Sequence, residues 1–510
     1  MSETPTFEPD RRDHVSHDNL LLAAADRLAR AIREFRPDRK YRMRVPEALI
    51  VGGYVRDQAL GLDPKDADIE VYGVDPERLY ALLEKMFGKT KEVGKAFGVI
   101  KVPIGDGLEL DVSIPRRDSK AGKGHTGIQA QSDPSMSVKE AARRRDFTVN
   151  TMAMNPLTGK RHDPFGGMDD LRAKILRVTD HEQFQEDPLR VLRAVQFVAR
   201  LEFSVDPESE RLMREMVERG DLAELPPDRV TKELEKLLTK APRPSVGFEF
   251  GRRIGLVERL FPEAEALVGV PQEPEWHPEG DVWVHTMMVV DAAARIARRD
   301  GLSLEQARPL MLGALDHDFG KPSTTEFLDG RIRSRGHEDA GEEPTRKMCE
   351  RLTFKQDDVE AAVAIAVNHL KPGTLYRARL SNELDEKQYV NAVRKLVRRL
   401  GKTSWRVLLA ASEADFRGRT IPGCDVDPYL PGKMLAETVV AHGLDQEAAK
   451  KLVQGRDLIT IFGLKAKDRT GSPIFGTILA AVEAARDDGR VETREQALAF
   501  VRDYLFKNPL

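Results

Sequence analysis

Residues 47–73 read EALIVGGYVRDQALGLDPKDADIEVYG, and this stretch decides the fold that we expect. It begins with an apolar run typical of a buried strand, continues as a short helical pattern and ends as a second strand. Gly52 and Gly53 stand where the first strand gives way to the helix, and Arg56 lies on the first helical turn. Paired glycines let backbone N–H groups approach a ligand, and a helix N-terminus or an arginine favours an anion. The stretch therefore predicts a phosphate-binding turn, although a glycine pair alone is typical of any tight turn.

Asp66 and Asp68 open the second strand two residues apart, so their side chains point to the same side. Like charges placed side by side repel each other, which makes a bound cation the natural partner for the pair. Asp111 lies in LELDVSI (108–114), another predicted strand with alternating apolar residues. Three carboxylates on neighbouring strands suit Mg²⁺, which can activate an attacking hydroxyl and stabilise a leaving pyrophosphate. For the pair alone, the alternative is a solvated Asp-x-Asp on an exposed strand.

The composition indicates a soluble chain of several domains. Its 510 residues predict two to four domains, and 32% of them are charged. No apolar run reaches the length of a membrane span, and the polar N-terminus lacks the apolar core of a signal peptide. With only Cys349 and Cys424, neither a disulfide framework nor a cysteine-based zinc site is available. We expect a cytoplasmic protein, and the net charge of −3 confines any nucleic-acid surface to a local patch.

The hydrophobic pattern changes along the chain from mixed to helical. We expect residues 1–18 to be disordered and 17–35 to form a helix capped by Asp18 or Asn19. The polar, aperiodic stretch 116–136 predicts a long flexible loop, and helical patterns dominate from about residue 137. The predicted class is α+β, a head with a small mixed sheet followed by helical regions. The predicted strands are 47–53, 67–73, 98–104 and 108–114, with a helix at 76–87 among them.

Two further stretches carry polar groups suited to a nucleotide. RRRDFTVN (143–150) ends a helical pattern with donors and acceptors for a ribose and phosphates. EDPLRVLRAVQFVAR (186–200) begins a helix with an aspartate at its cap and two arginines on one face, which could read a base edge or hold a triphosphate. Taken singly, each stretch is better explained as a helix cap with a solvated basic face. The candidate residues are Arg145, Asp146, Asn150, Asp187, Arg190 and Arg193.

In their order and spacing, GGYVRDQALG, DAD, RRDFTVN and EDPLRVLR closely resemble motifs of the class II tRNA nucleotidyltransferase and poly(A) polymerase family. LPPDRVTKELEKLL (225–238) resembles a later helical motif of that family, so the resemblance covers about residues 45–270. It implies a polymerase-β-like nucleotidyltransferase head that uses Mg²⁺, followed by helical neck, body and tail regions.

The resemblance also implies roles for single residues. In such enzymes the glycine turn and the following arginine bind the nucleotide, and the Asp-x-Asp binds Mg²⁺. The RRD motif contacts the nucleotide and its ribose, and the EDxxRxxR helix supplies a protein template that pairs with the incoming base. The implied catalytic residues are Asp66, Asp68 and Asp111, and the implied nucleotide-binding residues are Gly52, Gly53, Arg56, Arg145, Asp146, Asn150, Asp187, Arg190 and Arg193.

A second constellation follows the Pro-rich stretch 270–281, which we interpret as a domain boundary. Histidines and aspartates recur within helical patterns or at their ends in DVWVHTMMVV, DHDFGKP, GHEDAG, AVNHLKPG and ASEADFRGR. A lone histidine in a helix is more often structural than a ligand, but imidazole and carboxylate together suit divalent metals such as Mn, Ni, Co, Fe or Mg. The candidate metal ligands are His285, His317, Asp318 and Asp415, with His337 and His369 as further candidates.

This order of residues resembles the HD phosphohydrolase superfamily, and several bacterial CCA-adding enzymes carry an HD domain in this position. The resemblance covers most of 270–420 and implies a metal-dependent hydrolase of 2′,3′-cyclic or other small phosphates, with a transition metal such as Ni, Co or Mn. The alternative is a relic all-α domain whose histidines sit in the core. The predicted domains are 1–45 (N-terminal extension and helix), 46–180 (head), 181–270 (helical neck and body), 271–424 (HD domain) and 425–510 (helical tail).

A basic helix and the C-terminal region are candidate RNA contacts. YVNAVRKLVRRLGKTSWR (389–406) clusters Arg394, Lys395, Arg398, Arg399, Lys402 and Arg406 around an apolar stripe, which suits an RNA backbone or is simply solvated. Residues 452–501 resemble the tail of bacterial CCA-adding enzymes, with KAKDRTGSP where many relatives have a compact Pro-Gly-Pro link.

These patterns predict an enzyme that adds C, C and A to the 3′ acceptor end of tRNA from CTP and ATP, with no membrane partner. Three alternatives stay open: a CC-, A- or poly(A)-adding enzyme of the same family, a phosphohydrolase with a nucleotide-sensing head, and a non-catalytic RNA-binding protein. The sequence leaves both a monomer and a homodimer open.

Overall fold

The chain forms two compact units. The computed structural model describes residues 17–37, 44–64, 66–88, 91–93, 98–105, 107–120, 128–445, 451–465, 474–487, 489–491 and 493–508. One unit comprises Met1–Val230 with Arg253–Leu256, and the other comprises Thr231–Arg252 with Val257–Leu510. No helix in these ranges is both long and apolar enough to cross a bilayer. Of the stretch predicted to be disordered, residues 1–16 lie outside the described residues, and helix α1 begins at His17.

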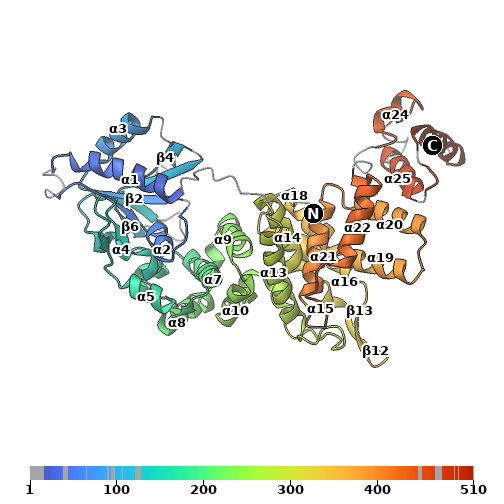
Figure 1. Ribbon diagram of the computed structural model, residues 1–510, viewed down its shortest axis with the longest axis horizontal. Helices are drawn as coiled ribbons and strands as arrows, with labels where there is room; N and C mark the ends of the chain where they lie inside the picture. Colours follow the sequence, from blue (N-terminus) through green and yellow to red (C-terminus); the bar gives the residue numbers. More distant parts are fainter. Residues whose placement is uncertain are drawn as a thin grey trace, which may run out of the picture. The chain divides into compact units, whose positions relative to one another are not determined.

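The first unit is built on a mixed sheet (Figure 1). Among the described residues, seven strands form this sheet in the order β3-β4-β5-β2-β1-β8-β9. Strands β2 and β5 are parallel, and the other neighbours are antiparallel. The α+β class is therefore confirmed. The strands are β1 (Glu47–Val51), β2 (Ala67–Tyr72), β3 (Lys91–Val93), β4 (Val99–Gly105), β5 (Leu108–Ser113), β8 (Ala153–Met154) and β9 (Arg161–His162).

Helices cover this sheet because its central strands are apolar on both faces. The four residues Ala48–Val51 of β1 are all buried, as expected for a strand in the middle of a sheet with packed faces. Helix α1 (His17–Arg33) packs on β1 and β5 through an apolar stripe that includes Leu21 and Leu28. The other helices here are α2 (Gly53–Ala59), α3 (Pro76–Phe87) and α4 (Val138–Arg143).

The flexible loop predicted over 116–136 is partly wrong. Strands β6 (Arg116–Lys120) and β7 (Ile128–Ser132) pair in antiparallel register, and residues 121–127 between them lie outside the described residues. The prediction failed because RRDSK and IQAQS lack the apolar alternation of a half-buried strand. Their ladder is held by backbone hydrogen bonds, which leave no mark on the sequence.

Short helices continue the first unit and lead into the second. Asp187 does not occupy the cap position itself: helix α7 begins at Leu189 after Pro188, and Asp187 accepts a hydrogen bond from the Leu189 N–H (3.2 Å). The elements are η3 (Thr148–Asn150), α5 (Gly167–Ala173), β10 (Ile175–Leu176), α6 (His181–Gln185), α7 (Leu189–Leu201), β11 (Ser204–Val205), α8 (Pro207–Glu218), η4 (Asp221–Glu224), α9 (Pro227–Lys240), α10 (Pro244–Arg253), α11 (Leu256–Leu260) and α12 (Pro262–Glu265).

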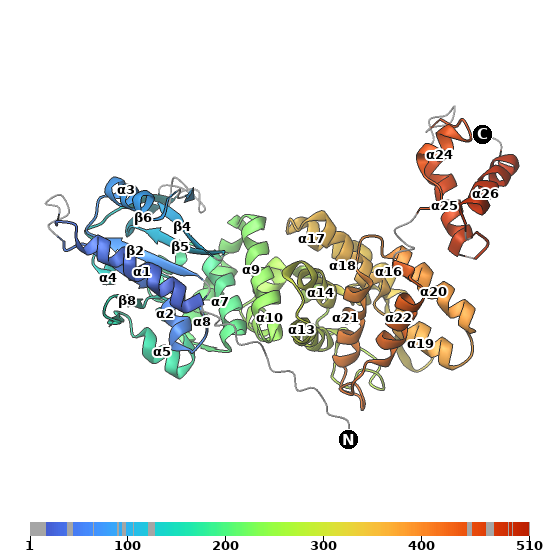
Figure 2. The same cartoon turned by 45° about the horizontal axis from the view of Figure 1, so that its top comes forward.

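Four long helices form the centre of the second unit. Figures 1 and 2 show α13 (Val282–Arg299), α14 (Leu304–Asp316), α18 (Gln356–Asn368) and α21 (Trp405–Arg417) side by side, and their contacts agree. A hairpin of β12 (Thr325–Leu328) and β13 (Arg331–Ser334), which the helical pattern did not predict, projects beside them. The remaining elements here are α15 (Lys321–Thr324), α16 (His337–Ala340), α17 (Glu342–Arg351), α19 (Lys371–Leu380) and α20 (Glu386–Arg399).

The C-terminal region is helical, as predicted. Its elements are α22 (Leu430–Ala441), α24 (Gly455–Thr460), α25 (Ile474–Asp487) and α26 (Arg494–Lys507). Helix α25 begins at Ile474, and residues 466–473 before it lie outside the described residues. Val453, Ile478 and Val501 belong to one apolar cluster that joins the last three helices.

Candidate nucleotidyl-transfer and metal sites

The head places three predicted carboxylates together on two neighbouring central strands of its sheet, near the start of β2. Asp68 lies opposite Asp111 in the parallel register of β2 and β5, and Asp66 immediately precedes β2. Asp66 and Asp68 are exposed, although the rest of β2 is buried. Lys101 on β4 reaches Asp111 Oδ1 at 3.1 Å and Glu109 Oε2 at 2.9 Å. Oxygen-only, solvent-facing donors of this kind fit Mg²⁺, which keeps waters and substrate oxygens in its shell.

Asp68 differs from an ordinary surface aspartate in its protonation. The protein around it hinders hydration of the charged form, and this raises its pKa to about 6. Arg145 opposes this rise, whereas the negative charges of Asp66 and Asp111 add to it. A cation held among these carboxylates would remove their mutual repulsion, so the electrostatics also fit a metal.

Gly52 leaves the space through which Arg145 approaches these carboxylates. Gly52 has a φ of 73°, and a Cβ on it would lie 2.7 Å from Arg145 Nη1 and 3.6 Å from Asp68 Oδ2. A side chain would therefore both strain the backbone and displace the guanidinium. The glycine turn thus allows Arg145 to lie beside Asp68, and Gly53 begins α2 directly after this turn.

Asp146 and Asn150 form a buried polar network rather than open ligands. Asp146 Oδ1 accepts hydrogen bonds from the Phe147 N–H and from Asn150 Nδ2, both at 2.9 Å. Its Oδ2 accepts one from Arg193 Nε at 2.7 Å. Burial alone would raise the pKa of Asp146, but Arg193, Asn150 and Arg190 outweigh burial and lower the pKa to about 2. Asp146 is thus a fixed negative charge that holds Arg193 in place.

Arg56 is also buried and engaged. It donates to Asn150 Oδ1 through Nη1 at 2.6 Å and to Asp57 Oδ1 through Nε at 2.7 Å. The structure therefore joins the glycine turn to the RRD motif through Arg56 and Asn150. Direct contact between Arg56 and a nucleotide stays a prediction.

The predicted template residues lie at the start of α7. Arg190 donates to the carbonyl oxygens of Gln183 (2.7 Å) and Arg144 (2.6 Å). Asp187 Oδ2 accepts from Arg229 Nη2 at 3.2 Å, and both side chains are about one quarter exposed. Arg229 belongs to the LPPDRV motif, so this second motif supports the first by an ion pair. The pattern of the sequence did not single out Arg229.

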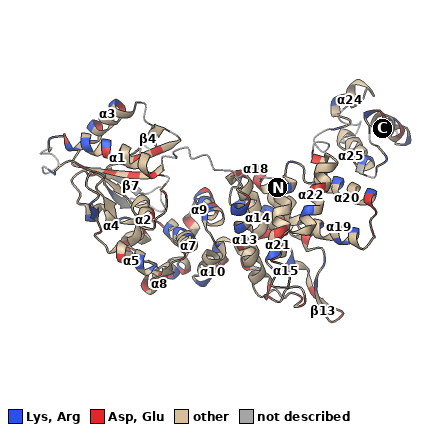
Figure 3. Cartoon of the chain, in the orientation of Figure 1, with Lys and Arg blue, Asp and Glu red and all other residues tan. Residues whose placement is uncertain are grey.

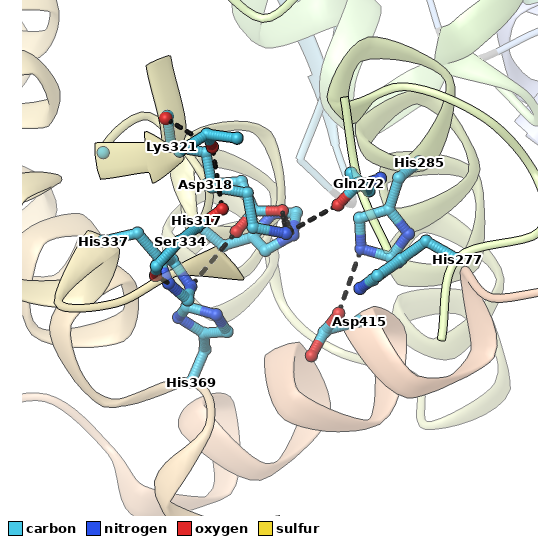
Figure 4. A network of polar contacts seen from close by, with 12 residues as sticks. Gln272, His277, His285, His317, Asp318, Lys321, Ser334, His337, His369 and Asp415 are labelled. Carbon is cyan, nitrogen blue, oxygen red and sulfur yellow. Dashed lines mark hydrogen bonds and ion pairs between the residues drawn. The ribbon is translucent and has the colours of Figure 1, made fainter. Parts of the chain in front are cut away.

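The second unit gathers all the predicted HD residues around one point (Figure 4). His285 comes from α13, Asp318 follows α14, and Asp415 comes from α21; all are buried. His285 Nε2 lies 3.1 Å from Asp415 Oδ1. The remaining members of the cluster are His317 at the end of α14, His337 at the start of α16 and His369 at the end of α18.

Electrostatics keep Asp318 and His369 in the forms that bind a metal. Burial opposes the charge of Asp318, but His317, Lys321 and His337 hold its pKa well below the ordinary value. Burial lowers the pKa of His369 to about 3, which keeps its imidazole neutral. Ionised carboxylate and neutral imidazole are the forms that bind a metal, so the donor set fits a divalent ion.

Two residues of the cluster were missed by the sequence analysis. Glu279 Oε1 lies 2.9 Å from His277 Nδ1 and 2.8 Å from His285 Nδ1. A carboxylate on Nδ1 orients the ring and leaves Nε2 as the ligand. Both residues lie in the Pro-rich stretch that we interpreted only as a boundary, and the spacing of HPEGDVWVH was the available signal.

Gly320 allows the segments of the cluster to meet. A Cβ at this position would lie 1.9 Å from the carbonyl oxygen of His337 and 2.7 Å from the backbone nitrogen of Gly341. Since no side chain fits in that space, the turn after Asp318 can lie directly against the start of α16 only with glycine at 320.

A cavity of about 760 Å³ opens beside this cluster. His277, His337, His369 and Asp415 line one part of it. Aromatic side chains and cations line the rest: Trp276, Tyr376, Phe416, Tyr429, Lys321, Arg377 and Arg419. The arrangement can accept a ligand with both an anionic group and a flat apolar group.

Part of the basic stretch predicted to follow RNA is paired with carboxylates. Arg398 is only 9% exposed and lies 3.8 Å from Glu483 of α25. Arg399 lies 3.7 Å from Asp339, and Lys402 lies 3.1 Å from Asp357. Figure 3 likewise shows acidic and basic residues interspersed over the helices. The RNA-binding role of residues 389–406 stays a prediction.

Comparison with protein families agrees with these two sites. Residues 48–177 match the poly A polymerase head domain, 202–267 match the probable RNA and SrmB-binding site of polymerase A, and 282–399 match the HD domain. The fold and the site define a class: nucleotidyltransferases with a poly A polymerase head joined to an HD domain, both of which imply divalent metals.

Individual relatives narrow this class. The multifunctional CCA protein of Methylobacillus flagellatus is 39% identical over 85% of this chain and 96% of its own length. The Burkholderia mallei protein of the same name is 37% identical over 77% of this chain and 89% of its own. The chain belongs to the multifunctional CCA protein family. The fold also resembles the Bacillus stearothermophilus CCA-adding enzyme solved with CTP (TM-score 0.59, 22% identity, 94% of this chain and 97% of that one).

Proposed function

We infer that the chain adds C, C and A to the 3′ end of tRNA from CTP and ATP without a nucleic-acid template. Membership of the multifunctional CCA protein family is the observation that carries this function. In each step the 3′ hydroxyl of the tRNA attacks the α-phosphorus of the nucleotide, and pyrophosphate leaves. Bound Mg²⁺ would lower the pKa of the hydroxyl and neutralise charge on the phosphates.

The residues of the head are suited to distinct parts of this reaction. Asp66, Asp68 and Asp111 would hold the cation, since their carboxylate oxygens lie near one another at β2 and β5. Arg145 adds a positive charge beside them for the triphosphate, and Gly52 leaves the room that it needs. Catalysis by such a site is mainly positioning and charge neutralisation.

Base choice would lie with Asp187 and Arg190, with Gly53, Arg56, Asn150 and Arg193 at the nucleotide. The two template residues stand at the start of α7, and hydrogen bonds hold them there: Arg229 donates to Asp187, and Arg190 donates to two backbone carbonyls. A rigid pair of this kind can select a base edge by its donors and acceptors.

The test is incubation with tRNA that lacks its 3′ CCA, with CTP, ATP or both. We expect two C and then one A when both nucleotides are present, and no more than CC with CTP alone. A long A tail, CC alone in the presence of ATP, or A alone would instead indicate one of the narrower or poly(A)-adding activities.

We also propose that the HD unit hydrolyses a nucleoside phosphate, including 2′,3′-cyclic ones. The aromatic and cationic lining of the cavity beside the histidine cluster supports this, because a nucleobase could stack there with its phosphate at the metal ligands. Hydrolysis of 2′,3′-cyclic nucleotides by the full chain, lost in Asp318→Asn, would support it. A full rate in Asp318→Asn would contradict it. We expect an enzyme with these substrates to act in the cytoplasm.

A further inference from the structure

Glu70 lies on the same face of β2 as the candidate metal ligand Asp68. Asp68, Glu70 and Tyr72 alternate along the strand, so their side chains point to one side of the sheet. Asp68 is exposed, whereas Glu70 is only 1% exposed and Tyr72 is fully buried. Burial of a carboxylate costs free energy unless positive or hydrogen-bonding partners surround it. The partners of Glu70 therefore indicate what its charge does in the head.

Three neighbours engage the carboxylate of Glu70. Tyr72 Oη donates to Oε2 at 2.8 Å, and Arg144 Nη2 donates to Oε1 at 3.4 Å. Arg145 Nη2 lies 3.8 Å from the same Oε1. Both arginines follow α4 directly, and Ala141 of that helix belongs to one apolar cluster with Tyr72. Glu70 thus holds the end of α4, and with it the RRD motif, against the face of β2.

The guanidinium of Arg145 lies between Glu70 and Asp68. A Cβ on Gly52 would lie 2.7 Å from Arg145 Nη1 and 3.6 Å from Asp68 Oδ2, so both side chains border the same small space. Of the described carboxylates, Glu70 is the one within ion-pair distance of Arg145. The side chain of Arg145 is 19% exposed and that of Glu70 is 2% exposed. Arg145 can therefore meet a ligand from solvent while Glu70 holds its buried side.

Arg145 has two carboxylates within reach and can pair fully with only one of them. A guanidinium binds a carboxylate best through two parallel N–H groups, and such a pair with Asp68 would use both Nη1 and its neighbour. A positive charge on Asp68 would also oppose a metal ion at that carboxylate. Because Glu70 attracts Nη2, it turns only Nη1 to the glycine turn and leaves the oxygens of Asp68 to a metal.

We propose that Glu70 is a positioning residue for nucleotidyl transfer, which keeps Arg145 from pairing with Asp68 and so leaves Asp68 available to the metal. The proposal rests on the function inferred for the head. Glu70 acts through Arg145 and touches neither metal nor nucleotide. Its effect on metal binding should therefore vanish once Arg145 is removed, whereas a general role in stability, or a direct effect of its charge, would persist.

The test measures metal binding by the head without turnover. Full-length chains carry Asp318→Asn to weaken metal binding at the histidine cluster, and the further changes Asp66→Asn and Asp68→Asn give the blank to subtract. Electron paramagnetic resonance follows free Mn²⁺ during titration, and circular dichroism melting establishes that each variant is folded. Tyr72→Phe is the matched control, because it removes a hydrogen bond from Glu70 but leaves the charge. The compared variants are Glu70→Gln, Glu70→Asp, Arg145→Gln, Glu70→Gln with Arg145→Gln, and Tyr72→Phe.

We expect Glu70→Gln to raise the Mn²⁺ dissociation constant of the head by about tenfold, and Tyr72→Phe by less than about twofold. The double variant should match Arg145→Gln. If Glu70→Gln does not fold, Glu70→Asp, whose shorter side chain withdraws the carboxylate from Arg145, should show the rise instead. An unchanged constant in the folded variants, or the same rise on the Arg145→Gln background, would overturn the proposal.

Nucleotide incorporation separates this proposal from the function on which it rests. In chains that keep Asp318, the Mg²⁺ concentration for half-maximal incorporation of CTP into tRNA lacking CCA should rise in Glu70→Gln as the Mn²⁺ constant does. A parent that adds no nucleotide but shows the expected Mn²⁺ constants would refute the transferase function and leave the role of Glu70 toward the metal intact. A parent that adds CCA while the Mn²⁺ constants ignore Glu70 would refute the role of Glu70 alone.

Discussion

The head and the HD unit present their carboxylates in opposite ways. Asp66 and Asp68 are exposed at the start of the central strand β2, and the pKa of Asp68 is raised to about 6. Asp318 and Asp415 are buried among histidines, and their pKa values lie well below the ordinary range. An open site suits a metal that arrives with a triphosphate and leaves with pyrophosphate. A closed site suits a metal that stays between turnovers. A divalent ion can thus be delivered with the substrate in the head and be held permanently by the protein in the HD unit.

Removing one carboxylate from each site should produce the largest effect. Asp68→Ala should reduce nucleotide incorporation into tRNA by about 1,000-fold or more, since it removes the charge that orients metal and triphosphate. Asp318→Asn should leave incorporation unchanged and abolish hydrolysis of 2′,3′-cyclic nucleotides. The rates of both reactions are measured for each variant. Loss of incorporation in Asp318→Asn would show that the two sites are not separate.

The head also contains a buried carboxylate, Asp146, whose loss should lower the stability of the fold. Asp146→Asn leaves Arg193 without its anion, and we expect a loss of about 1 to 3 kcal/mol in the free energy of unfolding. Urea unfolding of the first unit measures it. Glu215→Gln is the matched control, because its pair with Arg211 is exposed on both sides and should contribute less than about 0.5 kcal/mol. Equal losses in the two variants would refute the distinction.

The protonation of Asp68 should make the head, rather than the HD unit, sensitive to mild acid. Because its folded-state pKa lies above the ordinary value, a proton competes with the metal below about pH 6. The Mg²⁺ concentration for half-maximal incorporation should rise by about tenfold per pH unit below 6 and stay flat above 7. A half-maximal concentration that is the same at pH 5.5 and 7.5 would contradict this expectation.

The smallest effect should come from removing Arg229, which forms an ion pair with the template residue Asp187. Arg229→Ala removes the ion pair of Asp187, and we expect about a three- to tenfold loss of discrimination between CTP and UTP. Arg229→Lys keeps the charge and should lose less. Steady-state kcat/KM for each nucleotide gives the ratio. Unchanged discrimination in Arg229→Ala would show that Asp187 is held by its backbone contact with Leu189 alone.

Sequence reasoning predicted the parts of the fold whose signal is local. The bounds of α3 followed from Asp75, which caps it, and from Gly88 after its end. The sequence did not predict the polar strands β6 and β7 or the hairpin of β12 and β13, because backbone pairing alone defines them.

The same limit applies to the sites. The residues in motifs could be singled out, and the structure does bring the HD residues together. Lys101 and Arg229 could not be, since each acts through a partner on another element. His277 and Glu279 were missed although the spacing of HPEGDVWVH offered a signal. The neighbours that keep Asp146 and Asp318 ionised against their burial are also brought together only in the folded chain.

Gly320 makes the HD site sensitive to a change that touches no ligand. The backbone of His337 already fills the place where a side chain at 320 would begin. A single methyl group there would push the His337 segment away from Asp318, whose Oδ1 lies 3.4 Å from His337 Nε2. Gly320→Ala would thus separate two members of the histidine cluster although residue 320 is not itself a candidate ligand.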